Sequence, residues 1–348
     1  MKPLRICLTT LLIYLSISVA VAADWQRIKL GVQGESFDFP VYANHDMRSD
    51  LSRIREVIII IHGVNRNADE YFNTAQSLLK DSGRDAKEIL LLAPKFPGLN
   101  DPKQEFDELP IWKAQDWAVG LAATNRPTGL SAFDVLDNLL LKITDKTDFP
   151  SVTSVNVAGH SAGAQLVQRY AVLNHVDEQI RARSLDLRYI VANPSSFLYF
   201  TAQRPVEKTF KDFPAEQCPA FNQYRYGMDN MPAYSTGISS QGLFKRFAYR
   251  NVVYLMGGSD NDPAHKYLDT SCPAMAQGLT RLARAQAYVR YERFLAGRAA
   301  KINHLAYEVI GIGHDQKKMF GSVCAMNILF QSRPDKESRA ATCQPYLF

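Results

Sequence analysis

The chain has 348 residues, of which 46% are apolar and 22% are charged, and its mean hydropathy is -0.20. These values are typical of a globular protein with a sizeable core, and they exclude an intrinsically disordered or membrane-embedded chain. The formal charge is only +5, and basic residues are interspersed with acidic ones without forming a basic stripe. We therefore expect no binding to nucleic acid.

The N-terminus has the layout of a secretory signal peptide. Two basic residues precede an apolar run over residues 6–20, and Ala-Val-Ala at 20–22 offers small residues for cleavage. The alternative is an uncleaved membrane anchor, but the run is short for a span and ends at the cleavage-like site. We predict that residues 1–22 are removed. Residues 23–348 would then form one secreted or periplasmic domain without stable membrane insertion.

After the signal peptide, apolar runs of strand length alternate with stretches of helical spacing. The run 57–61 is continuously β-branched and apolar, which is typical of a strand buried on both faces. Ser131 precedes apolar residues at helical spacing and is a favoured N-cap. Strands are predicted at 26–43 (a β-hairpin), 57–61, 89–93, 152–157, 187–192, 251–256 and 304–310, and helices at 67–80, 131–143, 162–173, 275–298 and 316–330. This alternation predicts an α/β fold with a mostly parallel central sheet and helices on both faces.

One stretch, residues 201–250, interrupts this alternation. It lies between two predicted strands, is too long for a simple crossover and is rich in Phe and Tyr. We interpret it as a cap insertion over the sheet edge where active sites form, because long structured insertions tend to be functional. Within it, Phe221, Tyr224 and Tyr226 are predicted to contact the substrate. The alternative is a surface excursion whose aromatic side chains pack only on one another.

Residues 159–163 read Gly-His-Ser-Ala-Gly, a G-x-S-x-G motif between a predicted strand and a predicted helix. In this context the turn is so tight that the serine backbone is strained and its neighbours must be small. The hydroxyl of Ser161 is thereby pushed clear of the sheet, and the helix N-terminus beneath it supplies unpaired N–H groups. The motif therefore predicts that Ser161 is a nucleophile.

A serine hydroxyl is a weak nucleophile and needs a base within hydrogen-bond reach. His314 is the best candidate because it follows the last predicted strand, in a Gly-Ile-Gly-His loop that can bend. The base in turn needs a carboxylate to fix its tautomer. Asp260 and Asp262 both follow the strand 251–256. We prefer Asp260, because Asp262 precedes a proline and suits a structural role.

Acyl transfer also needs N–H donors for the developing oxyanion. One donor should be the backbone N–H of Ala162, directly after the nucleophile. The second should come from the loop after the strand 57–61, where His62-Gly63 is followed by Val64. We assign this second donor to the backbone N–H of Val64.

Of the five cysteines in the chain, Cys7 lies within the predicted signal peptide. The other four form an even set that suits two disulfides in an oxidising compartment, and four cysteines allow three connectivities. We prefer Cys218–Cys272 and Cys324–Cys343, because Cys218 lies in the cap insertion and the second pair is close in sequence. The alternative is four free thiols. No Cys/His spacing indicates zinc, and we predict no metal site.

These segments resemble the α/β-hydrolase superfamily over roughly residues 50–330. The resemblance rests on Ile61-His62-Gly63, the G-x-S-x-G motif 159–163, the G-x-x-D stretch 257–260 and the Gly-Ile-Gly-His stretch 311–314. Serine, aspartate and histidine also follow one another along the chain in the order found in that superfamily. His62-Gly63 followed by Arg66-Asn67-Ala68 is similar to secreted polyester depolymerases and feruloyl-esterase-like enzymes.

The resemblance implies an α/β-hydrolase fold and hydrolysis of small-molecule or polymer carboxylic esters through an acyl-enzyme on Ser161, with no metal or organic cofactor. A serine peptidase on the same fold would use the same triad chemistry. A non-catalytic binding protein that retains the fold is a third hypothesis, because a fold does not define a function. Reaction with a serine-directed phosphonate separates the enzymes from the binding protein. Panels of esters and peptides then separate an esterase from a peptidase.

Overall fold

The computed structural model describes residues 24–346 except 33, 107, 236, 298–300 and 332–341. The predicted signal peptide, residues 1–22, lies outside the described residues. Among the residues that are described, no helix is both long enough and apolar enough to cross a membrane.

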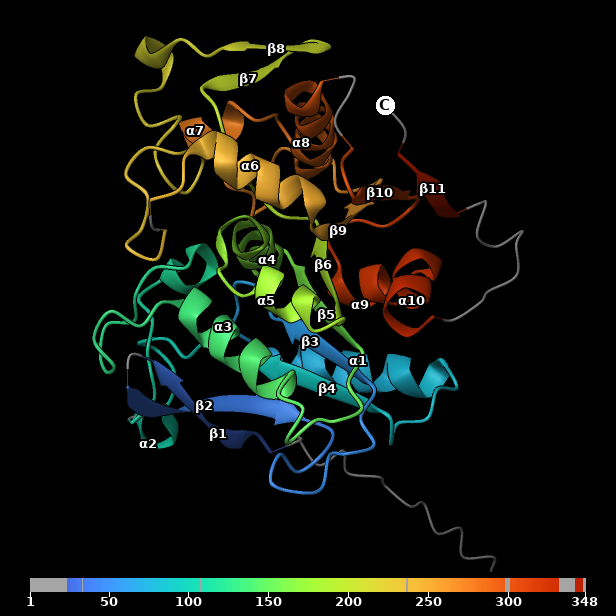
Figure 1. Ribbon diagram of the computed structural model, residues 1–348. Helices are drawn as coiled ribbons and strands as arrows, with labels where there is room; N and C mark the ends of the chain where they lie inside the picture. Colours follow the sequence, from blue (N-terminus) through green and yellow to red (C-terminus); the bar gives the residue numbers. More distant parts are fainter. Residues whose placement is uncertain are drawn as a thin grey trace, which may run out of the picture.

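A nine-stranded sheet runs through the centre of the molecule, in the order β1-β2-β4-β3-β5-β6-β9-β10-β11 (Figure 1). Strands β4 to β10 in this order run parallel to one another, whereas β1, β2 and β11 pair antiparallel at the two edges. The strands are β1 (Gln26–Val32), β2 (Glu35–Ala43), β3 (Glu56–Ile61), β4 (Ile89–Pro94), β5 (Ser154–His160), β6 (Asp186–Ala192), β9 (Asn251–Gly257), β10 (His304–Val309) and β11 (Cys343–Pro345). The connections that leave β3 and β5 go to opposite sides, and a ligand-binding crevice is expected where strand order reverses in this way.

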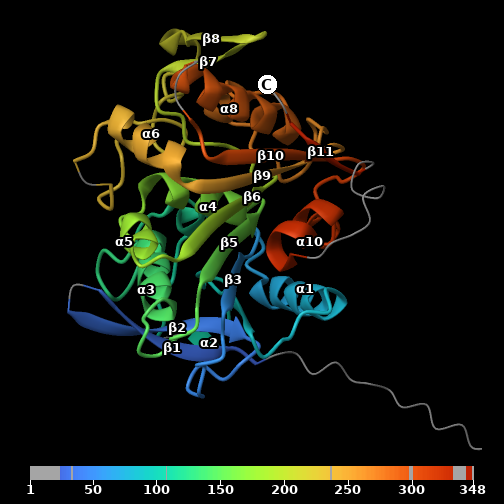
Figure 2. The same ribbon diagram turned by 45° about the vertical axis from the view of Figure 1, so that its right-hand side comes forward.

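Helices cover both faces of the sheet, as the sequence predicted (Figures 1 and 2). Neighbouring residues of β3 point to opposite faces, so that Ile60 lies in one apolar cluster and Ile59 in the other. The first cluster contains residues of α1 (Ala68–Asp81), α9 (Gln316–Phe320) and α10 (Val323–Phe330). The second contains residues of α3 (Ala132–Ile143), α4 (Ala162–Leu173) and α8 (Arg281–Ala296). Shorter helices in connecting segments are α2 (Lys103–Phe106), η1 (Asp116–Val119) and α5 (Asp177–Ala182).

Two predicted helices differ from the structure. The first, predicted at 275–298, begins only at Arg281 as α8; Met275 instead ends a separate short helix, α7 (Cys272–Met275), and Gly278 lies between the two at φ +144°. Thr280 then caps α8 by accepting a hydrogen bond from the N–H of Ala283. The second divides into α9 and α10, where the hydroxyl of Ser322 caps α10. In both cases a side-chain cap starts a new helix inside a stretch that has helical periodicity.

Residues 201–250 contain a small hairpin and one longer helix. The hairpin consists of β7 (Gln203–Val206) and β8 (Thr209–Asp212), and it is followed by η2 (Ala215–Gln217) and α6 (Ser240–Tyr249). Figure 1 shows β7 and β8 beyond α8, outside the central sheet. The ring of Phe210 attaches the hairpin to α8 by packing on Tyr291 and Phe294, with ring centroids 5.3 and 5.2 Å apart.

Two disulfides link Cys218 to Cys272 and Cys324 to Cys343. This confirms the pairing that the sequence favoured. The first bond joins the segment 201–250 to the start of α7, and the second joins α10 to the edge strand β11.

Candidate active site

A tight turn between β5 and α4 carries Ser161. Its backbone has φ 59° and ψ -120°, a strained conformation for a residue with a side chain. A Cβ atom on Gly159 would collide with the backbone of Gly163, and one on Gly163 would collide with the carbonyl of Ile61. Glycine at both positions therefore lets β3, β5 and the first turn of α4 approach closely enough to form the turn.

The structure brings Ser161, His314 and Asp260 together in one chain of hydrogen bonds. His314 Nε2 lies 2.9 Å from Ser161 Oγ, and His314 Nδ1 lies 2.8 Å from Asp260 Oδ2. His314 comes from the loop after β10 and Asp260 from the loop after β9, so neighbouring parallel strands end at the same edge of the sheet. A carboxylate accepts at Nδ1, which places the imidazole proton there and leaves Nε2 to accept from the serine hydroxyl.

Asp260 is buried and, besides its hydrogen bond with His314, has the cationic neighbour Arg281. Its Oδ1 accepts a hydrogen bond from Nη1 of Arg281 at 3.1 Å, and both side chains are almost fully buried. Burial alone would raise the pKa of Asp260, but the hydrogen bond from His314 and the charges of His314 and Arg281 outweigh it and lower this pKa. Asp260 is therefore held as an anion. Asp262 is exposed instead, and its Oδ1 accepts from the backbone N–H of Ala264 in a turn.

Two further histidines flank the ring of His314. The ring of His160 lies 4.7 Å from it, and the ring of His265 lies 5.0 Å from it, edge to face. Burial lowers the pKa of His160 well below its ordinary value, and burial together with the charge of Arg281 lowers the pKa of His265. Both neighbours are therefore mainly neutral at pH 7, and they hold the His314 ring in place without adding a charge.

The two predicted oxyanion donors, the N–H groups of Val64 and Ala162, belong to residues that line one cavity together with Ser161. The N–H of Ala162 is the first of α4 and has no intrahelical acceptor. Such donors next to a nucleophile can receive the negative charge that develops on a carbonyl oxygen.

The direction of the Val64 N–H is set by His62. The imidazole Nδ1 of His62 lies 2.9 Å from the carbonyl oxygen of Gly63, and its Nε2 accepts from the N–H of Phe96 at 3.2 Å. Burial lowers the pKa of His62 to about 3, so the ring is neutral and Nδ1 donates. The Gly63 carbonyl and the Val64 N–H belong to one planar trans peptide and point in opposite directions. Fixing the carbonyl therefore also fixes the N–H.

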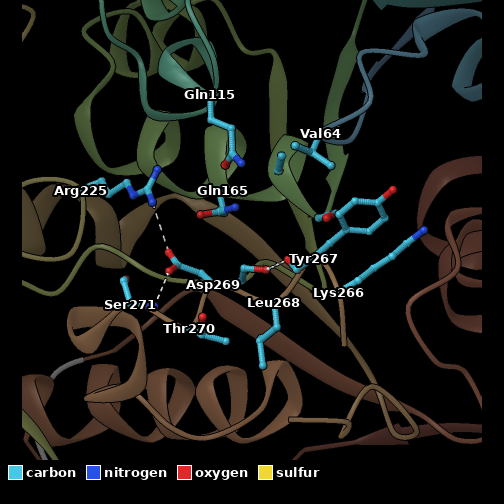
Figure 3. A pocket seen from close by; sticks show the side chains of 13 residues that line it. Val64, Gln115, Gln165, Arg225, Lys266, Tyr267, Leu268, Asp269, Thr270 and Ser271 are labelled. Carbon is cyan, nitrogen blue, oxygen red and sulfur yellow. Dashed lines mark hydrogen bonds and ion pairs between the residues drawn. The ribbon is translucent and has the colours of Figure 1, made fainter. Parts of the chain in front are cut away.

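Two cavities meet at Ser161. One has a volume of about 330 Å³ and the other about 300 Å³, and both are lined by Val64, Ser161, Lys266 and Tyr267. The second also includes His314 and His265. Figure 3 shows the first cavity, in which most labelled side chains are polar: Gln115, Gln165, Arg225, Lys266, Asp269, Thr270 and Ser271.

The aromatic residues predicted to contact the substrate lie behind this lining. Among the residues described, Arg225 lines the first cavity, whereas Phe221, Tyr224 and Tyr226 line neither. Phe221 packs on Phe213, the Tyr224 hydroxyl donates to the carbonyl of Val119, and the Tyr226 hydroxyl donates to Asp269. Their rings are buried within the protein, which is the usual state of aromatic side chains, and the charged residue between them faces the cavity.

Comparison with protein-family models and with curated protein sequences gives no match. Solved structures do match. The poly(aspartic acid) hydrolase-1 from Sphingomonas sp. KT-1 aligns with a TM-score of 0.60 and 21% identity, over 89% of this chain and 100% of that one. The poly(3-hydroxybutyrate) depolymerase LpqC from Bordetella parapertussis aligns with a TM-score of 0.59 and 20% identity, over 92% and 94%. The protein has the α/β-hydrolase fold. This confirms the fold class predicted from the sequence.

Several residues of the candidate site carry no local motif and were missed by the sequence analysis: Gln165, Arg225, His265, Asp269 and Arg281. For one of them, its position in a helix could have indicated a nearby anion. Arg281 is the first residue of α8, where the positive end of the helix dipole disfavours a cation unless an anion lies close to it. Within the described part of the chain, no group of three or more His, Cys, Asp or Glu side chains is arranged to hold a metal ion.

Proposed function

We propose that this protein is a serine hydrolase that cleaves carboxylic esters through an acyl-enzyme on Ser161. The observation that supports this most directly is the hydrogen-bonded series Ser161–His314–Asp260 at a strained turn, with two candidate oxyanion donors beside it. A nucleophile, a base and an orienting acid in hydrogen-bond contact are the signature of nucleophilic catalysis.

In the proposed reaction, the oxygen of Ser161 attacks the ester carbonyl carbon while its proton moves to Nε2 of His314. The carbonyl π electrons move onto oxygen, and this oxyanion accepts hydrogen bonds from the N–H groups of Val64 and Ala162. Collapse breaks the bond to the alcohol oxygen, which takes the proton from Nε2 and leaves. A water molecule then attacks the acyl-enzyme in the same way and releases the acid and the free serine. The Asp260 anion stabilises the imidazolium in both halves.

The test is a Ser161→Ala variant measured beside the wild-type protein. Turnover of a small ester should fall by several orders of magnitude while the variant remains folded. A serine-directed phosphonate should add one covalent group to the wild type, at Ser161 by peptide mapping, and none to the variant. Ser271→Ala, which removes another hydroxyl from the same cavity, should still be labelled. Near-normal turnover by Ser161→Ala would exclude the assignment.

A serine peptidase is the second candidate, because one structural neighbour is named for a polymer of an amino acid and the other for a polymer of a hydroxy acid. Both reactions would use Ser161 and His314. The two are separated by comparing kcat/KM for matched amide and ester substrates with the same acyl group. We expect the ester to be preferred, and a preference for the amide would assign the protein to the peptidases.

We further propose that the enzyme is secreted or periplasmic, as a single mature domain of residues 23–348 capped by the segment 201–250. Two disulfides suit an oxidising compartment, which supports this location. Arg225 of that segment lines the cavity beside Ser161, which supports the role of a cap. N-terminal sequencing of protein recovered outside the cytoplasm should begin at about residue 23, and an intact Met1 would exclude cleavage.

A further inference from the structure

Arg225 is held in the wall of the first cavity by a buried network that also contains the nucleophile helix. Its backbone carbonyl accepts hydrogen bonds from Nε and Nη2 of Arg169, at 3.2 and 2.9 Å, and Arg169 is fully buried. Arg169 lies on α4, which begins directly after Ser161. The buried guanidinium of Arg169 therefore fixes the backbone of Arg225 relative to Ser161.

The same network sets the orientation of Gln165, which also lines the cavity. The hydroxyl of Ser196 accepts from Nη2 of Arg169 at 3.1 Å and so donates its own hydrogen to Oε1 of Gln165 at 2.9 Å. With its oxygen engaged in this way, the Gln165 amide has its NH₂ group left for the cavity. Gln165 thus contributes donors beside the nucleophile.

The carboxylate of the same wall, Asp269, already accepts several hydrogen bonds. Asp269 accepts from the Tyr226 hydroxyl at 2.7 Å, from Nη2 of Arg225 at 3.3 Å and from the N–H of Ser271 at 3.0 Å. Burial would raise the pKa of Asp269, but these hydrogen bonds and the charge of Arg225 outweigh it and lower this pKa. Asp269 is therefore an anion whose lone pairs are largely occupied.

The guanidinium of Arg225 has more N–H donors than its hydrogen bonds within the protein use. Its Nε and Nη2 are directed to the Tyr226 hydroxyl and to Asp269. Its Nη1 has no partner among the described residues, and the side chain is 31% exposed. Figure 3 shows Arg225 and Asp269 facing each other at one end of the cavity, next to Gln115 and Gln165. Lys266 adds a second positive charge to the lining, whereas Asp269 is the one carboxylate among the described residues that line this cavity. The wall therefore has a net positive charge.

We propose that this cavity is a subsite for a carboxylate carried by the ester substrate, bound by Arg225 and Gln165 beside Ser161. This assignment rests on the proposed esterase function. The unpaired Nη1 of Arg225 offers charge-assisted N–H donors to a carboxylate, and the Gln165 amide supplies a further N–H. The volume of about 330 Å³ suits a short charged group, and the polar lining disfavours a long alkyl chain.

Two pairs of substrates test the proposal and distinguish which part of the ester carries the charge. In the acyl pair, the 4-nitrophenyl monoester of adipic acid is compared with 4-nitrophenyl heptanoate. In the alcohol pair, 3-acetoxybenzoate is compared with phenyl acetate. The wild-type enzyme should prefer the charged member of one pair by about tenfold or more in kcat/KM. The pair that shows the preference identifies the side of the ester that occupies the cavity.

Variants then assign the preference to Arg225. Arg225→Met should reduce the charged-to-uncharged ratio of kcat/KM by about tenfold, mainly through KM, and Arg225→Lys should reduce it less. Lys245→Met removes a positive charge from α6, away from this cavity, and should leave the ratio unchanged. An unchanged melting temperature and unchanged phosphonate labelling of Arg225→Met would show that the site is intact.

Different results would contradict the carboxylate subsite and the esterase function. Hydrolysis of all four esters without a charged preference, or a preference that Arg225→Met retains, would overturn the subsite and leave the esterase function standing. Absence of hydrolysis for every ester, together with absence of phosphonate labelling, would overturn the proposed function and the subsite with it.

Discussion

Asp260 differs from the neighbouring Asp262 in its surroundings rather than in its chemistry. Asp260 is 3% exposed and shares its two oxygens between His314 and Arg281, whereas Asp262 is exposed and caps a turn. An orienting acid must remain ionised and fixed, because the base it holds otherwise loses its tautomer and direction. Burial, the hydrogen bond from His314 and the positive charge of Arg281 together satisfy both requirements at Asp260.

A matched pair of asparagine variants should separate these roles. Asp260→Asn should lower kcat by several orders of magnitude, because the amide offers His314 a donor where an anion stood. Asp262→Asn should lower kcat less than about threefold, because it changes only a turn at the surface. Steady-state kinetics on one activated ester measures both. A larger loss in Asp262→Asn would transfer the role of the acid to Asp262.

Arg281 should influence the acid limb of the pH–rate profile. It places a positive charge on the Asp260–His314 pair, and this charge opposes protonation of the pair. In Arg281→Met that opposition is lost, so the acid limb of kcat/KM should move to higher pH by about one unit. Arg281→Lys retains the charge and should shift the limb less. The same loss of charge also acts on His160 and His265, because the charge of Arg281 contributes to lowering the pKa of each in the wild type.

Arg284 provides the control for this experiment. It is buried one turn further along α8 and donates to the backbone carbonyls of Ser195 and Gly278, without a carboxylate partner among the described residues. Arg284→Met should therefore reduce stability without moving the acid limb. An equal movement in Arg281→Met and Arg284→Met would show that the profile reports loosening of the helix rather than loss of charge at Asp260.

Helices α3 and α4 are connected to the segment 201–250 by one buried carboxylate. Asp137 of α3 accepts hydrogen bonds from the hydroxyls of Tyr170 on α4 and Tyr234 in the segment, both at 2.7 Å. Burial raises the pKa of Asp137 from 3.8 to about 6, although the two hydroxyls lower it in part. The folded state therefore binds a proton more tightly than the unfolded state does at this position.

The sign of the resulting pH dependence follows from linkage. A group with a raised pKa in the folded state contributes its full stability below the unfolded pKa, and this contribution is lost as the pH rises through the folded pKa. For Asp137 the window runs from about pH 4 to about pH 6. Over this window the free energy of unfolding should fall by roughly 2–3 kcal/mol through this residue alone.

Asp137→Asn removes this titration and should reveal it by difference. The free energy of unfolding of the variant, relative to wild type, should increase by roughly 2–3 kcal/mol between pH 4 and pH 7. Urea unfolding followed by tryptophan fluorescence measures it, and the other titrating groups cancel in the difference. Asp148→Asn, which replaces an exposed carboxyl, is measured beside it as the control. A constant difference for Asp137→Asn would refute the raised pKa.

The two disulfides act on different parts of the whole molecule. Cys218–Cys272 closes a separation of 54 residues and joins the segment 201–250 to the residue after Ser271 in the cavity wall. Cys324–Cys343 closes a separation of 19 residues at the far edge of the sheet. In the loop-entropy description, the longer loop stabilises the folded state by about 1 kcal/mol more than the shorter one.

Serine double variants should follow this order. Loss of Cys218–Cys272 should cost about 1 kcal/mol more in the free energy of unfolding than loss of Cys324–Cys343. It should also raise KM, because the wall that contains Asp269 and Ser271 loses an attachment, whereas loss of the second bond should leave KM unchanged. Chemical unfolding and ester kinetics on the two variants measure these effects. An effect on KM from the Cys324–Cys343 pair alone would contradict the assignment of the cavity wall.

Much of this protein could be predicted from local sequence. The continuous apolar runs identified the parallel strands, because a strand buried on both faces consists mainly of apolar residues. The G-x-S-x-G motif located Ser161, because only glycine permits the close approach of β3, β5 and α4. The helix boundaries were less predictable. The helices predicted at 275–298 and 316–330 ran across Gly278 and Ser322, whereas the caps at Thr280 and Ser322 begin α8 and α10.

The sequence alone identified the fold class, Ser161 and His314, and it favoured Asp260 and the cysteine pairing that the structure contains. The surroundings of these residues are seen only in the folded molecule. Arg281 contacts Asp260, which is 21 positions away in the sequence. Arg225 lies opposite Asp269, which is 44 positions away. A local period of 2 or 3.6 residues reports which face of an element is buried, but not which distant side chain will lie against it. The polar wall beside Ser161 therefore has no local signature, since it is formed where separate loops converge.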